Sequence, residues 1–123
     1  MSKKILVVED TEDNRQILRD LLSMAGYEMV EAHDGAEGVA KAAEHKPDLI
    51  LMDIQMPVMD GYEATRRIKA NPDLKAIPIV AVTSYALSGD EEKTRAAGCD
   101  SYIAKPYSPR QMLAKVREIL GAE

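Results

Sequence analysis

The 123 residues carry a net charge of −5, and 46% of them are hydrophobic while 30% are charged. A chain of this size and composition can fill the core of one domain, whereas its acidic charge argues against binding to nucleic-acid phosphates. The apolar runs are too short to span a membrane, and the first residues do not form a signal peptide. The single cysteine excludes a disulfide within the chain. A cytoplasmic location is therefore expected.

Five apolar runs alternate with helical segments along the chain. The runs predicted as strands cover residues 4–8, 28–32, 48–52, 77–82 and 101–104. Three of them are nearly continuous in Ile, Leu and Val, which is typical of parallel strands that are covered on both faces.

Apolar residues recur at helical spacing between these strands. In the first helical segment the predicted buried face carries Ile17, Leu18, Leu21 and Leu22. Arg15, Arg19 and Asp20 are expected away from that face. The last segment is predicted to bury Met112, Leu113, Val116, Ile119 and Leu120.

Start and stop signals flank the helical segments. Motifs with the spacing of a capping box begin at Asp34, Asp60, Ser88 and Ser108. Gly26 and Gly98 stand where helices are expected to end.

Strand–helix units joined by short connections predict an α/β fold, with a parallel sheet between two layers of helices. This is a flavodoxin-like (βα)5 three-layer sandwich, for which the expected strand order is 2-1-3-4-5. No linker divides the chain, so residues 1–123 are expected to form a single domain with no output domain.

Polar residues directly follow four of the strands. Glu9 and Asp10 follow the first, Asp53 the third, Thr83 the fourth and Lys105 the fifth. Ligands bind at the carboxyl ends of such strands, where neighbouring first and third strands would bring the three acidic residues together. Their repulsion would raise their pKa values or attract a cation, and Mg²⁺ fits an all-oxygen site. A carboxylate nucleophile, a metal, a lysine and a hydroxyl can together stabilise a transferring phosphoryl group.

Each of these residues also has a purely structural interpretation. Glu9 and Asp10 could cap the first helix, because carboxylates are favoured at helix N-termini. Asp53 could begin a turn, Thr83 could bond its own backbone, and Lys105 could pair with a surface acid. Their joint occurrence at strand ends favours the functional interpretation.

Longer motifs resemble those of response-regulator receiver domains over residues 4–120. They are Ile5-Leu-Val-Val-Glu-Asp10, Asp53-Ile-Gln-Met-Pro57, Met59-Asp-Gly61 and Tyr102-Ile-Ala-Lys-Pro106. The resemblance implies that Asp53 is the phosphoacceptor and that Lys105 and Thr83 bind the phosphoryl group.

The same resemblance implies a Mg²⁺ site and a switch. Asp10, Asp53 and the backbone carbonyl of Gln55 would ligate Mg²⁺, with Glu9 acting through water. Thr83 would move together with Tyr102, although half-buried packing on the fifth strand is an alternative role for this tyrosine.

Three further positions follow from the resemblance. The Lys105–Pro106 bond would be cis. Gln55 and Tyr85 would tune the lifetime of the phosphate.

The implied function is a two-component signalling switch. The chain would take its phosphoryl group from a histidine kinase or phosphotransferase and hydrolyse it on itself, so it would not be a conventional enzyme. It would signal to a protein target through the helix after Thr83, the fifth strand and the last helix. Neither nucleic acid nor membrane insertion is expected, and the chain is expected to be a monomer or weak dimer.

The resemblance is to stand-alone regulators of chemotaxis and of cell division or polarity. A receiver excised from a hybrid kinase and a non-phosphorylated scaffold remain as alternative interpretations.

Two other protein classes share this architecture but fit the sequence less well. A hydrolase with an aspartate nucleophile would need a second Asp where Gln55 stands. A flavin-binding module would need a phosphate-cradling loop, where this chain has the acidic residues 9–13.

Overall fold

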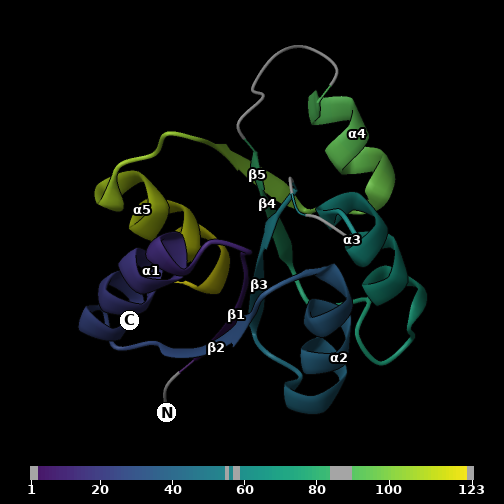
Figure 1. The fold of residues 1–123 in the computed structure, drawn as a ribbon, viewed down its shortest axis with the longest axis horizontal. Coiled ribbons are helices and arrows are strands. Elements are labelled where there is room, and N and C mark those ends of the chain that lie inside the picture. The colour runs from purple at the N-terminus through teal and green to yellow at the C-terminus, as the bar shows by residue number, and fades with distance from the viewer. Residues whose placement is uncertain (1–2, 55, 57–58, 84–89, 122–123) are drawn as a thin grey trace.

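The computed structural model describes residues 3–54, 56, 59–83 and 90–121. Within these residues strands and helices alternate along the chain (Figure 1). The strands are β1 (Lys4–Val8), β2 (Glu28–Ala32), β3 (Leu49–Asp53), β4 (Ile79–Thr83) and β5 (Ser101–Ala104). The helices are α1 (Glu12–Met24), α2 (Gly35–His45), α3 (Gly61–Ala70), α4 (Asp90–Ala97) and α5 (Pro109–Leu120).

The strands form one parallel sheet in the order β2-β1-β3-β4-β5. Helices α1 and α5 cover one face of the sheet, and α2, α3 and α4 cover the other (Figure 1). This arrangement confirms the predicted flavodoxin-like sandwich and its strand order. Within the described residues, no helix is long and apolar enough to cross a bilayer.

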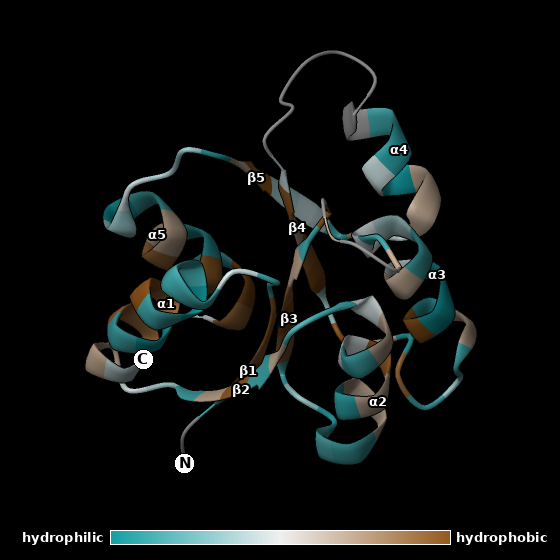
Figure 2. Cartoon of the chain, viewed as in Figure 1, coloured by the Kyte–Doolittle hydropathy of each residue, from teal (hydrophilic) through white to brown (hydrophobic). Residues whose placement is uncertain are grey.

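Alternate residues of the central strands build two aliphatic cores. Leu6 and Ile50 pack on the side of α2 and α3, whereas Ile5, Leu49 and Leu51 pack on the side of α1 and α5. The strands accordingly carry much of the hydrophobic colour in Figure 2. Because both faces are filled, the sheet is a rigid support for the residues at its carboxyl edge.

Two strands end later than the sequence predicted. β3 and β4 begin after the predicted starts at residues 48 and 77 and continue through Asp53 and Thr83. Asp53 is paired with Val82, and Thr83 with Ala104. The strand ends were predicted at the last apolar residue, but backbone pairing carries each strand one polar residue further.

The predicted faces of α1 were wrong at two positions. Ile17 is 55% exposed, whereas Arg15 is only 5% exposed. Burial of Arg15 is possible because acidic and carbonyl oxygens surround its guanidinium, which spacing along the helix alone does not reveal. The predicted apolar face of α5 is confirmed, with Met112 and Val116 buried and the other members partly buried.

Helix ends follow the predicted signals closely. Asp34 and Asp60 cap α2 and α3 by accepting the backbone N–H three residues on, and Ser108 and Gln111 form the complete capping box of α5. The box predicted at Ser88 lies outside the described residues. Gly26 and Gly98 follow α1 and α4 with φ of 90° and 106°, a conformation that favours glycine.

Gly61 lets the start of α3 approach the end of β3. A Cβ atom at this position would overlap the carbonyl oxygen of Asp53 and lie 2.8 Å from the Cα of Ile54. Since these neighbours are backbone atoms, they cannot move aside without shifting the segment that carries Asp53.

We therefore expect Gly61→Ala to lower the free energy of unfolding by about 1–3 kcal/mol, the usual cost of overpacking. Urea denaturation measures this change. The control is Ala40→Ser on the exposed side of α2, which should change stability by less than about 0.5 kcal/mol. Equal stability of Gly61→Ala and the wild type would contradict the tight contact.

Candidate functional site

The ends of β1 and β3 bring three carboxylates together. Glu9, Asp10 and Asp53 each offer an oxygen that lies within 4.8 Å of the others, and we call these residues the acidic cluster. Glu9 is 4% exposed and Asp53 is 3% exposed, whereas Asp10 faces solvent. Negative charges this close and this buried repel one another strongly. Their oxygen-only donor set fits a hard divalent cation such as Mg²⁺.

Lys105 supplies a positive charge to the acidic cluster. Its Nζ lies 3.5 Å from Glu9 Oε2 and 3.5 Å from Asp53 Oδ1. The backbone N–H of Lys105 donates to the Thr83 carbonyl at 2.7 Å, which ties the end of β5 to β4. The Lys105–Pro106 peptide bond is cis, the geometry that the resemblance implied.

The carboxylate of Glu9 also holds the start of α1. Its Oε1 accepts from the backbone N–H of Thr11 at 3.2 Å and from the side chain of Asn14 at 3.3 Å. Burial alone would raise the pKa of Glu9, but the contact with Asp53, the charge of Lys105 and these donors outweigh burial and hold the pKa below its usual range. Glu9 therefore contacts the segment that begins α1 as well as the other residues of the acidic cluster.

Thr83 and Tyr102 lie on neighbouring strands but in different surroundings. Thr83 is 1% exposed at the end of β4, at the same edge of the sheet as Asp53. Tyr102 is half-buried on β5 and packs against the core on the α2 and α3 side. Packing is thus one role of Tyr102, and its part in a switch stays a prediction. Gln55 and Tyr85, the predicted tuning positions, lie outside the described residues.

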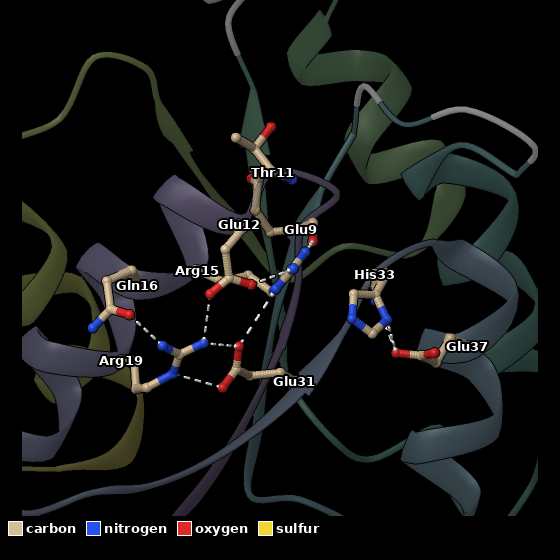
Figure 3. A network of polar contacts seen from close by, with 9 residues as sticks. All are labelled: Glu9, Thr11, Glu12, Arg15, Gln16, Arg19, Glu31, His33 and Glu37. Atoms are coloured by element: carbon tan, nitrogen blue, oxygen red, sulfur yellow. Dashed lines mark hydrogen bonds and ion pairs between the residues drawn. The ribbon is translucent and has the colours of Figure 1, made fainter.

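Sequence reasoning missed three residues around the acidic cluster. Asn14 contacts Glu9 directly, and Tyr107 lies close enough for the charges of Glu9 and Asp53 to act on it. Arg15 donates to the backbone carbonyl of Glu9 (Figure 3). Asn14 and Arg15 are five and six residues after Glu9, a spacing that lets the start of α1 turn back on the end of β1.

A cavity of about 490 Å³ opens next to Lys105. It is lined by Asn14, Ile17, Lys105, Pro106 and Tyr107. The exposed Ile17 thus forms part of the wall of this cavity. Asn14 and Lys105, which both contact Glu9, form another part of the wall.

Tyr107 is expected to ionise late. Burial, followed by the charges of Glu9 and Asp53, raises the pKa of Tyr107 to about 12. An unfolded tyrosine ionises near pH 10, so the protonated phenol stabilises the fold fully below about pH 10, and this stability is lost as the pH rises toward 12. Tyr107→Phe should remove a late step from the phenolate absorbance titration, which is free of tryptophan absorbance because the chain has none.

The control for this titration is Tyr27→Phe, which changes a partly buried tyrosine between α1 and β2 and should leave the late step in place. Persistence of the step in Tyr107→Phe would contradict the assignment.

Comparison with known proteins places this geometry in a family. Residues 5–117 match the response regulator receiver domain. The polar-differentiation response regulator DivK of Brucella anthropi is 44% identical over 121 residues, which cover 98% of each chain. The fold is similar to that of the chemotaxis protein CheY4 of Vibrio cholerae, with a TM-score of 0.92 and 31% identity over 97% of this chain and 99% of that one.

A second solved structure bears on the metal. The receiver domain of the sensor histidine kinase PA1611 from Pseudomonas aeruginosa is 36% identical, with a TM-score of 0.91 over 99% of this chain and all (100%) of that one. Its structure has a magnesium ion coordinated in the active site cleft. Sequence and structure therefore agree that this chain belongs to the response regulator receiver domains of two-component signalling.

Proposed function

We propose that the chain is a phosphorylation-dependent switch that accepts a phosphoryl group on Asp53. The observation that carries this proposal is the buried Asp53 carboxylate, which lies beside two other carboxylates and 3.5 Å from the Lys105 amine. Asp53 is the member of the acidic cluster at the end of β3, a strand that is buried along its whole length. Such a rigid support favours in-line attack by a carboxylate oxygen.

The acidic cluster would hold Mg²⁺. Asp10 and Asp53 would ligate it directly and Glu9 through water, with the backbone carbonyl of Gln55 as a further ligand. When bound, the ion would neutralise charge on the phosphoryl oxygens.

The proposed reaction is transfer from a phosphohistidine of a histidine kinase or phosphotransferase. An Asp53 carboxylate oxygen attacks phosphorus, the P–N bond breaks, and the imidazole leaves with the bonding pair and takes up a proton. Lys105 and the Thr83 hydroxyl would hold the phosphoryl oxygens of the resulting acyl phosphate. Water later cleaves this bond and restores Asp53, so no external substrate is turned over in the manner of a conventional enzyme.

The output surface is proposed to be the α4-β5-α5 face. Among the α4 residues whose side chains the structure describes, Thr94 and Ala97 are the buried ones. A helix that buries a threonine and an alanine has little apolar surface to hold it in place, so movement of Thr83 and Tyr102 could shift it. The shifted face would then bind a downstream protein.

We propose that the chain is a stand-alone cytoplasmic regulator, a monomer or weak dimer in which residues 1–123 form a single receiver domain. The match to the response regulator DivK, which covers 98% of each chain, supports the stand-alone form. A receiver module of a hybrid kinase is the second candidate, because the similar PA1611 domain belongs to a sensor histidine kinase. A non-phosphorylated scaffold is less well supported, since the acidic cluster and Lys105 are all in place.

Intact-mass spectrometry after incubation with acetyl phosphate tests the proposed site. We expect one phosphate adduct in the wild type that is lost in Asp53→Asn and in excess chelator. The matched control is Asp60→Asn, which changes another aspartate near the site but keeps its helix cap, because Asn caps as well as Asp. A normal adduct in Asp53→Asn would overturn the assignment of the phosphoacceptor.

Lys105→Ala is expected to separate phosphorylation from switching. The variant should still gain the adduct, because Asp53 and the acidic cluster are intact, but its phosphorylation should no longer shift the amide resonances of β4 and β5. Lys105→Arg, which keeps the charge, is the control and should retain part of the response. Equal resonance shifts in Lys105→Ala and the wild type would contradict a switching role for this lysine.

A further inference from the structure

A buried arginine supports the acidic cluster from the start of α1. The side chain of Arg15 is 6% exposed. Its Nη1 donates to the backbone carbonyl of Glu9 at 2.6 Å, and its Nη2 donates to the carboxylate of Glu12 at 2.6 Å (Figure 3). A guanidinium at this depth is stable only when its donors find partners.

The charge of Arg15 is balanced within its own network. Its Nε lies 3.4 Å from Glu31, and Arg19 bridges the same two glutamates, with Nη2 at 2.6 Å from Glu31 and 3.2 Å from Glu12 (Figure 3). Hydrogen bonds and charges from the arginines hold the pKa values of Glu12 and Glu31 below their usual range. Two arginines and two glutamates thus neutralise one another, so the effect of Arg15 on the acidic cluster is geometric more than electrostatic.

Glu9 is fixed at every polar group. Its amide donates to the Ala32 carbonyl at 3.0 Å, its carbonyl accepts from Arg15, and its carboxylate contacts Thr11, Asn14 and Lys105. The carbonyl is the group that Arg15 controls, and it belongs to the peptide plane that joins Glu9 to Asp10. Fixing this plane fixes the direction in which the chain leaves β1.

Asp10 depends on that backbone direction. Its side chain is exposed, and among the described residues it makes no hydrogen bond or ion pair. The position of its carboxylate in the acidic cluster is therefore set by the main chain.

We propose that Arg15 is a positioning residue for the divalent-cation site, acting through the Glu9–Asp10 peptide. This inference rests on the proposed function, since it assumes that the acidic cluster binds Mg²⁺. The planar fork of an arginine is needed because one side chain must reach a carbonyl and two carboxylates at once. Groups that orient metal ligands in this way tune metal affinity without touching the metal.

Calorimetric titration of the protein with MgCl2 tests the proposal. Arg15→Met keeps much of the side-chain bulk and is expected to raise the Mg²⁺ dissociation constant about 10-fold or more, the usual effect of losing an orienting partner. The matched control is Arg19→Met, which removes a cation from the same two glutamates but leaves the Glu9 carbonyl bond intact. Its dissociation constant should stay close to that of the wild type.

A second readout separates positioning from a general loss of structure. The rate of labelling by acetyl phosphate, measured against Mg²⁺ concentration, should show a shifted midpoint in Arg15→Met but a nearly normal rate at saturation. Arg15→Lys keeps the charge and reaches one acceptor at a time, so its affinity should be intermediate. If Arg15→Met does not fold, the Mg²⁺ dissociation constant of Arg15→Lys tests the proposal in its place.

An unchanged Mg²⁺ dissociation constant in Arg15→Met, or in Arg15→Lys where the methionine variant is unfolded, would overturn the proposal. Equal weakening in Arg15→Met and Arg19→Met would overturn it too, since loss of charge would then explain both. A wild type that binds no Mg²⁺ and gains no adduct would instead refute the proposed function itself.

Discussion

Mutual repulsion of three carboxylates at the ends of β1 and β3 is the constraint on which the rest of the site depends. The fold holds Glu9, Asp10 and Asp53 together although two of them are buried and would separate in a flexible chain. Lys105 offsets part of the charge from the far side of β4. What remains is an unbalanced negative site, which is suited to a divalent cation and, with it, a phosphoryl group.

The architecture explains how such a site can be rigid. β1 lies between β2 and β3 and is filled by aliphatic side chains on both faces, so the position of its last residues is fixed by packing. Gly61 brings the start of α3 against the backbone of Asp53. Around Glu9, contacts with β2, α1 and Lys105 extend this rigidity into the loop that carries Asp10. By contrast, α4 has less apolar surface with which to dock, and flexibility is proposed there.

Apolar periodicity was enough to predict the strands, their parallel arrangement and the meeting of Glu9, Asp10 and Asp53, because each depends on local patterns and on a common strand order. It failed at α1, where Arg15 is buried and Ile17 is exposed. The burial of a charged side chain depends on partners outside its own helix, here the carbonyl of Glu9 just after β1 and the carboxylate of Glu31 on β2. The exposure of Ile17 depends in turn on the neighbouring cavity, which local spacing does not encode.

A Mg²⁺ titration followed by the amide resonances of isotope-labelled protein tests directly whether the acidic cluster binds a divalent cation. We expect saturable shifts that are largest at Glu9, Asp10 and Asp53 and reach Lys105, with little change at acidic residues elsewhere, such as Asp20 on α1. Shifts that do not saturate, or that spread evenly over the acidic surface, would show that these carboxylates do not form a defined cation site.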